Sequence, residues 1–285
     1  MGSPTRAAGP KEPATSTRRR LDAELVRRGL APSRTRAAEL VEAGRVTVAG
    51  APAAKAARLV GPDEPVVVQG DPDRFVGRGG HKLDAALDSF SIDVTGRRFA
   101  DLGASTGGFT DCLLQRGAVE VVAVDVGRGQ LHERIRRDGR VVVVEGCNVR
   151  HLEREMLGGS VDGVVADLSF ISLRTVAPAI IGVLDPGAVA VLLVKPQFEA
   201  GRRDVARGRG VIVDPAVHRA VLEKVIATYR AGGLDVIGLL RSPLRGASGN
   251  VEFLLGLRPG GPIVAEESLG AMLDAVVAQP DEVDS

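Results

Sequence analysis

The ten residues DLGASTGGFT, positions 101–110, follow a short apolar strand pattern and precede a helical one. Glycines in a strand-turn-helix unit of this kind let the backbone approach a ligand closely. Serine at position 105 breaks the strict Gly-x-Gly-x-x-Gly spacing, which disfavours a nicotinamide dinucleotide. The acid that opens the loop suits the amino group of S-adenosylmethionine but would repel a pyrophosphate. We therefore predict that this cofactor binds to Asp101, Gly103, Ser105, Gly107, Gly108 and Phe109.

The next two strand patterns supply further polar candidates. Residues 121–125, VVAVD, end on Asp125, at the place where folds of this kind bind the ribose hydroxyls of a nucleotide. Asn148 follows the third strand pattern and is a candidate for contact with adenine. The alternative for Asn148 is an ordinary turn-forming asparagine.

Short apolar strands alternate with helical patterns through most of the chain. The helical patterns cover residues 110–116, 129–137, 173–183 and 215–229, and a final one covers 266–278. This alternation is typical of a mostly parallel, doubly wound sheet. We therefore predict an α/β, Rossmann-like fold with strands at 98–101, 120–124, 141–144, 163–166, 188–194, 236–240 and 251–257.

The N-terminal part has a different composition. Residues 1–17 are rich in Pro, Ala, Ser and Thr without periodicity, which predicts a disordered tail. Two short helical patterns follow, the second with Ser33 as its N-cap, and then two short strands. The predicted domains are a small α+β domain at 18–69, a Gly-rich linker at 70–80, the α/β domain at 81–260, and a C-terminal helix with an acidic tail at 261–285.

The net charge of +1 hides an uneven distribution of charge. Residues 1–60 hold twelve Lys and Arg against five Asp and Glu, and residues 261–285 hold six acids and no base. Cations along two adjacent helices are what binding to a phosphate backbone requires; the alternative is a solvated charged face. The predicted RNA-binding residues are Arg18, Arg19, Arg20, Arg27, Arg28, Arg34, Arg36 and Arg45.

Composition also excludes several classes of protein. Two cysteines, Cys112 and Cys147, cannot build a disulfide scaffold, and four histidines without spaced pairs predict no metal site. The longest apolar run, residues 188–194, is far shorter than the roughly 20 residues of a membrane-spanning helix. The N-terminus has no apolar stretch after its charges, so we read no signal segment. We expect a cytoplasmic protein without metal or membrane partners.

Lysine is rare in this chain, with five Lys among 37 basic residues. Lys195 ends the strand pattern AVLLVK, at the carboxyl edge where ligands of such sheets bind. An amine there can lose its proton and a guanidinium cannot, so Lys195 is the candidate base; the alternative is a lysine that only extends its charge to solvent. Asp167 ends another apolar strand in the same way.

The small domain resembles the RNA-binding module named after ribosomal small-subunit protein four. The matching run is RRRLDAELVRRGLAPSRTRAAELVEAGRVTVAG, residues 18–50, followed by Lys55, which joins the predicted RNA-binding residues. Ala49 stands where the family usually has asparagine, which puts one turn contact in doubt.

Most of the chain resembles the TlyA family of ribosomal RNA 2′-O-methyltransferases, whose catalytic domain is FtsJ-like. The matching motifs are GRGGHKLDAAL, DLGASTGGFTD, VVADLSFISL, LLVKPQFE, GRGVIVD and SGNVEFLL. The resemblance implies S-adenosylmethionine as cofactor, and ribosomal RNA or ribosomal subunits as partners. It maps the family's Lys-Asp-Lys-Glu catalytic set onto Lys82, Asp167, Lys195 and Glu252, with Asp167 also at the cofactor.

The resemblance further implies that a cytidine ribose in small-subunit or large-subunit RNA is the methyl acceptor. A ribose inside a duplex has to be exposed, and flipping its nucleotide costs a few kcal/mol. Phe170 and Phe198, beside the two catalytic strand ends, are candidates to stack the extruded base; the alternative for each is a core residue. We expect Lys82 to lie next to Lys195, with the two acids holding the pair in place.

Three other functions compete with this interpretation. Proteins of the TlyA type also carry a hemolysin label, so a membrane-active protein is one alternative. A non-catalytic factor for ribosome binding or assembly is the second, and a nicotinamide dehydrogenase is the third. The missing apolar span counts against a membrane-active protein, and the complete catalytic set counts against a non-catalytic factor. Ser105 counts against a dehydrogenase.

Overall fold

The computed structural model describes residues 18–31, 33–69, 74–208, 210–246, 248–261 and 264–278. The chain divides into two compact units between Pro72 and Asp73. The predicted disordered tail at residues 1–17 and the acidic end from residue 279 lie outside the described residues.

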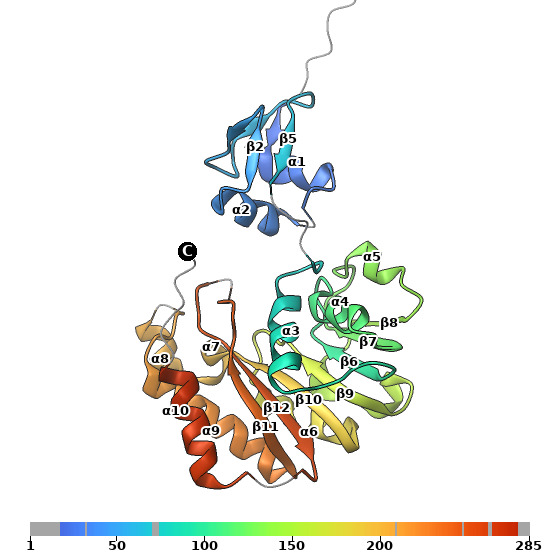
Figure 1. Cartoon of the computed structure of the whole chain (residues 1–285), viewed down its shortest axis with the longest axis vertical. Coiled ribbons are helices and arrows are strands. Elements are labelled where there is room, and N and C mark those ends of the chain that lie inside the picture. The colour runs from blue at the N-terminus through green and yellow to red at the C-terminus, as the bar shows by residue number, and fades with distance from the viewer. Residues whose placement is uncertain are drawn as a thin grey trace, which may run out of the picture. The chain divides into compact units, whose positions relative to one another are not determined.

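The first unit, shown in blue in Figure 1, packs two helices against small antiparallel sheets. Leu21, Leu25, Leu40, Val46 and Val48 form its core and are buried. The Ser33 side chain accepts a hydrogen bond from the backbone N–H of Arg36, which caps the second helix as expected. The elements are β1 (Arg19–Arg20), α1 (Leu21–Arg27), α2 (Arg34–Glu42), β2 (Val46–Val48), β3 (Ala51–Pro52), β4 (Leu59–Val60) and β5 (Val66–Val68).

The turn between β2 and β3 contains Ala49, at the position where the resembled RNA-binding module usually has asparagine. Ala49 has φ +51° and Gly50 has φ +81°. Asparagine enters this left-handed region more readily than alanine, for which it costs about 1 kcal/mol. The turn therefore forms with alanine, at a small expense in stability.

The second unit is built on a sheet of seven strands among the described residues, in the order β11-β12-β10-β9-β6-β7-β8. The strands β8, β7, β6, β9 and β10 run parallel, and β12 is antiparallel to both β10 and β11. The prediction of a mostly parallel, Rossmann-like sheet is therefore confirmed. The strands are β6 (Arg98–Leu102), β7 (Glu120–Asp125), β8 (Val141–Glu145), β9 (Val161–Ala166), β10 (Leu184–Val194), β11 (Leu234–Arg241) and β12 (Phe253–Pro259).

Helices cover both faces of this sheet (Figure 1). One apolar cluster joins the sheet to α3 (Gly79–Ser89), α4 (Gly108–Gln115) and α5 (Glu133–Arg136). The other joins it to α6 (Leu173–Val183), α9 (Pro215–Ala231) and α10 (Glu266–Ala278). The short helices α7 (Pro196–Glu199) and α8 (Arg202–Arg207) and the 3₁₀ helices η1 (Val149–His151) and η2 (Arg154–Leu157) complete the unit.

The strand order reverses at β6. The chain runs from β6 through β7 to β8 and then crosses to β9 on the other side of β6. Connections that leave in opposite directions open a crevice outside the carboxyl ends of β6 and β9, where ligands of such sheets bind. The loop at residues 103–107 and Asp167 both follow these strand ends.

The predicted linker at 70–80 extends too far at its C-terminal end. Phe75 and Val76 are buried in the core of the second unit, and α3 begins at Gly79. The glycines of this segment permit close packing rather than a free chain, since a Cβ on Gly80 would lie 2.3 Å from the Phe75 ring. The predicted helix at 129–137 is also wrong in length, because α5 covers only Glu133–Arg136.

Candidate active site

The loop between β6 and α4 depends on glycine at two points. Gly103 has φ +84°, and a Cβ there would lie 2.6 Å from the carbonyl oxygen of Asp167. Gly107 has φ +95° and would meet the Leu131 side chain at 2.9 Å. The loop therefore packs against Asp167 on one side and against the segment before α5 on the other. A side chain at position 103 or 107 would prevent this close packing.

Asp101 lies beneath the loop and is fully buried. The Thr110 hydroxyl donates to its Oδ2 at 2.6 Å, while Oδ1 is buried without a hydrogen-bond partner. Burial raises the pKa of Asp101 to about 7; the Thr110 hydrogen bond opposes the shift, and the nearby Asp167 carboxylate adds to it. An unpartnered buried acceptor at a ligand-binding edge indicates a place where a cation or hydrogen-bond donor fits.

Asp125 ends β7 and anchors the loop from the other side. Its Oδ2 accepts from the backbone N–H of Ser105 at 2.8 Å, and its Oδ1 accepts from that of Gly127 at 2.7 Å. Ser105 has φ +47°, and its hydroxyl donates to Gln130 Oε1 at 3.3 Å. The carboxylate keeps further lone pairs for a ligand, because each carboxylate has about four acceptor sites.

Two adjoining cavities lie along this edge of the sheet. The larger has a volume of about 620 Å³ and is lined among others by Asp125, Asn148 and Phe170, a size typical of small-molecule sites. The smaller, of about 190 Å³, is lined among others by Phe109 and Lys195. Both cavities share Gly103, Ser105, Asp167 and Ser169.

Asn148 and Phe109, both predicted at the cofactor, have structural contacts as well. The Asn148 side-chain oxygen accepts from the backbone N–H of Arg150 at 3.0 Å and caps η1. Asn148 therefore has the turn-forming role and also lines the larger cavity. Phe109 is buried, and a Cβ on Gly79 would lie 3.3 Å from its ring. Phe109 therefore supports the wall of the smaller cavity from the first turn of α4.

Lys195 and Asp167 meet at the ends of β10 and β9. Lys195 Nζ lies 2.6 Å from Asp167 Oδ1 and donates to the Ser169 hydroxyl at 3.1 Å. Both side chains are largely withdrawn from solvent, with exposed fractions of 12% and 26%. Lys195 and Asp167 therefore form an ion pair at these two strand ends, and the pair borders the smaller cavity.

Lys82 and Glu252 form a second pair. Lys82 lies on α3 and Glu252 immediately before β12; Nζ and Oε2 are 2.5 Å apart, and both residues are buried. A Cβ on Gly246 would lie 2.4 Å from Glu252 Oε1, so the loop before β12 closes over the carboxylate. Each lysine of the predicted set therefore has a carboxylate of its own.

Among the described residues of the second unit, Phe170 is the most exposed large apolar side chain, at 91%. Its φ of +63° is strained for a residue of this type, and its ring lies 5.2 Å from that of Phe198. The alternative of a core residue is therefore wrong for Phe170, and Phe198 is half-buried. Lys195 Nζ lies 5.9 Å from the Phe198 ring, so the aromatic pair adjoins the lysine.

Several residues of the site were missed in the sequence. Ser169 lines both cavities and contacts Lys195, and Gly77, Arg78 and Gly79 line the smaller one. The run GRGG contains the signal for the second group, because glycine density signals close backbone approach as well as a turn. Nothing in the sequence distinguishes Ser169 from an ordinary loop serine.

Many of the predicted RNA-binding arginines are engaged within the first unit. Asp22 pairs with Arg20 at 2.8 Å and Arg34 at 3.1 Å, and these arginines lower the pKa of Asp22 to about 2. Further ion pairs join Arg27 and Arg28 to Glu24, Arg18 to Glu64 and Arg36 to Glu39, and Arg45 donates to the Gln69 carbonyl.

Two predicted RNA-binding side chains of the first unit have no such partner. Arg19 and Lys55 are exposed, and neither side chain has a partner among the described residues. Arg28 is the opposite case, because it also donates to the carbonyls of Gly61, Pro62 and Glu64 and is only 19% exposed. Arg28 therefore stabilises the unit, whereas Arg19 and Lys55 have their charges available for a ligand.

Two absences hold for the part of the chain that the structure describes. No helix there is long and apolar enough to cross a membrane. No group of three His, Cys, Asp or Glu side chains there is arranged to hold a metal ion.

A doubly wound sheet with a glycine-rich loop at its switch point defines a Rossmann-like fold that binds a nucleotide-like ligand, and the lysine-aspartate pair lies beside that loop. A model of the FtsJ-like methyltransferase family matches residues 75–259, and a model of the S4 domain matches residues 19–66. The chain belongs to the FtsJ-like methyltransferases and, within them, to the TlyA family.

Three relatives illustrate the similarity. The 16S/23S rRNA (cytidine-2′-O)-methyltransferase TlyA of Mycobacterium tuberculosis is 53% identical over 242 residues, which cover 85% of this chain and 90% of that protein. Hemolysin A of Brachyspira hyodysenteriae is 40% identical over 237 residues, covering 82% and 98%. The solved structure of a candidate hemolysin from Streptococcus thermophilus superposes with a TM-score of 0.74 at 38% identity, covering 93% of this chain and 96% of that one. The resemblance stated from the motifs is confirmed.

Proposed function

We propose that this chain transfers the methyl group of S-adenosylmethionine to the 2′-oxygen of a cytidine ribose in ribosomal RNA. The observation that carries the proposal is the Lys195–Asp167 pair beside two cavities that share a wall. A donor in the larger cavity and a ribose in the smaller one would meet at Asp167 and Ser169. The relative from Mycobacterium tuberculosis, named for this reaction on 16S and 23S RNA, supports the choice of substrate.

The residues at the larger cavity fit S-adenosylmethionine. Gly103 and Ser105 offer closely approachable backbone, Asp125 offers acceptors for ribose hydroxyls, and Asn148 offers a side-chain amide for adenine. Asp101 is fully buried and lines neither cavity; from beneath the loop, its unpartnered Oδ1 suits the positive charge of the methionine end. When bound, the cofactor supplies a methyl group on a positively charged sulfur.

Lys195 is proposed as the base that receives the 2′-hydroxyl proton. Asp167 and Ser169 orient its amine from two directions, at 2.6 and 3.1 Å. For a hydroxyl that is held in line with the methyl group, methyl transfer requires little more than this alignment and the removal of the hydroxyl proton. Lys82 and Glu252 would act beside this pair as a second, buried charge pair at the acceptor ribose.

Phe170 and Phe198 are proposed to stack the extruded cytosine. Phe170 is exposed and held in a strained backbone conformation, features that gather at functional sites. Stacking of a base on an aromatic side chain contributes about 1–3 kcal/mol, which offsets the cost of flipping the nucleotide. The aromatic pair lies beside Lys195, where the ribose of the same nucleotide would be.

The first unit is proposed to bind the RNA phosphate backbone through the exposed Arg19 and Lys55, assisted by partly exposed arginines such as Arg34. Purified chain should be incubated with tritium-labelled S-adenosylmethionine and with separated small and large ribosomal subunits. We expect label in the RNA of one or both subunits. Cofactor binding without label in either RNA would favour a non-catalytic assembly factor, and leakage from liposomes without label would favour the membrane-active alternative.

A further inference from the structure

Glu199 is a buried carboxylate that joins the two segments carrying the candidate catalytic pair. It ends α7, four residues after Lys195, and is 5% exposed. Its Oε1 accepts from the backbone N–H of Leu173 at 2.5 Å, and its Oε2 accepts from the Ser172 hydroxyl at 2.6 Å. Ser172 and Leu173 begin α6, five and six residues after Asp167.

The charge of Glu199 is compensated where it lies. Arg174 Nε approaches Oε2 at 3.3 Å, and the amino end of the eleven-residue helix α6 favours a negative charge. A buried carboxylate is costly unless it is hydrogen-bonded, and hydrogen bonds to an ionised acceptor are strong. Glu199 therefore fixes α7 to the start of α6 by contacts that are costly to break.

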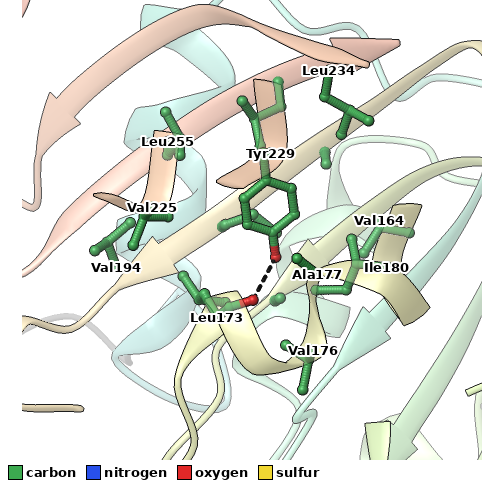
Figure 2. Close-up of a cluster of buried hydrophobic side chains, with 14 of the residues drawn as sticks. Val164, Leu173, Val176, Ala177, Ile180, Val194, Val225, Tyr229, Leu234 and Leu255 are labelled. Carbon is green, nitrogen blue, oxygen red and sulfur yellow. Dashed lines mark hydrogen bonds between the residues drawn. The ribbon is translucent and has the colours of Figure 1, made fainter. Parts of the chain in front are cut away.

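The start of α6 is also hydrogen-bonded to α9. The Tyr229 hydroxyl donates to the carbonyl of Leu173 at 3.1 Å, inside the apolar cluster of Figure 2. Tyr229 is fully buried. Leu173 is thus bonded at its carbonyl by Tyr229 and at its N–H by Glu199, so α7 is tied to a rigid body.

Closer to the catalytic pair, the segments 167–170 and 195–198 make three further contacts. Lys195 contacts Asp167 and Ser169, and Phe198 contacts Phe170. Only residues 196–198 separate Glu199 from Lys195, so few backbone torsions lie between the Glu199 hydrogen bonds and the lysine. A shift of α7 relative to α6 would therefore change the Lys195 contacts directly.

We propose that Glu199 is a positioning residue for methyl transfer. By tying α7 to the amino end of α6, it sets the distance of Lys195 from Asp167 and Ser169 and the position of Phe198 against Phe170. This inference rests on the proposed function of the Lys195–Asp167 pair. Nothing in it requires Glu199 to touch the cofactor or the RNA.

The matched control is Asp235, a second buried carboxylate with the same kind of partners. It pairs with Arg230 at 2.9 Å and accepts from the backbone N–H groups of Val236 and Val264. Asp235 is the second residue of the edge strand β11, which runs parallel to β10, so Asp235 lies at the amino edge of the sheet and Lys195 follows the carboxyl edge. Its loss should destabilise the unit without moving Lys195.

The experiment compares Glu199→Ala, Glu199→Gln and Asp235→Ala with the unaltered chain. Methyl transfer to ribosomal RNA is measured as kcat and KM over a range of pH, below the unfolding temperature of every variant, and cofactor affinity is measured by calorimetry. Glu199→Ala should lower kcat at least tenfold and displace its pH profile, because misplaced groups lose catalysis steeply. Its cofactor Kd should stay within about twofold, since the loop and Asp125 are untouched.

Glu199→Gln should recover most of kcat, because its oxygen still accepts from Leu173 and its amide can donate to Ser172. Asp235→Ala should lower the melting temperature as much as Glu199→Ala does, with kcat unchanged. The inference is overturned if Glu199→Ala keeps the kcat and pH profile of an active unaltered chain, or if Asp235→Ala loses kcat equally. An unaltered chain that transfers no methyl to ribosomal RNA would overturn the proposed function itself, and this inference with it.

Discussion

Lys195 Nζ lies 2.6 Å from Asp167 Oδ1, at the ends of two adjacent parallel strands. The register that pairs Leu192 with Ala166 brings the two following loops to the same edge of the sheet. The pair is therefore a product of the sheet topology, although 28 positions separate its members in the sequence.

Replacement of Lys195 by arginine tests its role as a base. Arginine keeps the positive charge beside Asp167 but cannot give up its proton at neutral pH. We expect Lys195→Arg to lower kcat at least 10²-fold, the scale of general base catalysis, while calorimetry shows unchanged cofactor binding. Lys224→Arg on the exposed face of α9 is the control. Near-normal kcat in Lys195→Arg would rule out the base role.

Replacement of Gly103 by alanine tests the cofactor loop. The new Cβ would meet the carbonyl oxygen of Asp167 at 2.6 Å in a backbone conformation that alanine avoids. We expect the Kd for S-adenosylmethionine to rise at least tenfold by calorimetry. Gly182→Ala on α6, where a Cβ meets nothing within 4 Å, should leave it unchanged. Equal affinities in the two variants would contradict the proposed position of the cofactor.

Burial of Asp101 makes stability depend on pH. Its pKa is raised to about 7 in the folded chain, against about 4 in an unfolded chain. The folded state therefore binds a proton that the unfolded state has lost between these values, so this group lowers stability progressively as the pH rises from about 4 to about 7. Asp101→Asn should melt above the unaltered chain at pH 8, by a margin that shrinks towards pH 4. A margin independent of pH would show that Asp101 is ionised throughout.

The buried Lys82–Glu252 pair should respond asymmetrically to mutation. Glu252→Gln leaves the Lys82 ammonium buried without its carboxylate, and breaking such a pair typically costs about 3–5 kcal/mol. Adding Lys82→Met in the same chain should restore much of the lost stability, as measured by urea unfolding. If the double variant is as unstable as Glu252→Gln, charge burial is not the reason for the loss.

The first unit should bind RNA through its available charges. Arg19→Ala and Lys55→Ala should each weaken RNA binding for all sequences and reduce the slope of log affinity against log salt by about 1. Arg28→Ala should lower the melting temperature instead, because its guanidinium bonds Glu24 and three backbone carbonyls. Filter binding at several salt concentrations distinguishes the two effects. An unchanged salt slope in the first two variants would place the RNA elsewhere.

The sequence was sufficient for those features that local patterns encode. All seven predicted strands of the large sheet are present among the described residues, and α6 and α10 have the predicted bounds. Asp167 and Lys195 could be anticipated at one edge because both end apolar strands, and parallel strands share their carboxyl edge.

What the sequence did not reveal depends on contacts between distant segments. The run GRGG at 77–80 resembles a linker in composition, yet its three glycines pack against Phe75, Thr106 and the first turn of α4. The exposure of Phe170 and the individual partners of Lys82 and Lys195 follow from tertiary packing, to which periodicity is blind. The internal ion pairs of Asp22 and Glu24 likewise reduce the number of free arginines in a way that counting charges cannot detect.

The chemical identity of the modified nucleoside tests the proposed methyl transfer most directly. Ribosomal RNA from subunits treated with the unaltered chain or with Lys195→Arg is digested to nucleosides and analysed by mass spectrometry against untreated subunits. The proposed base role of Lys195 predicts newly formed 2′-O-methylcytidine with the unaltered chain and none with Lys195→Arg. A methyl group on a base, or equal 2′-O-methylcytidine from both proteins, would contradict it.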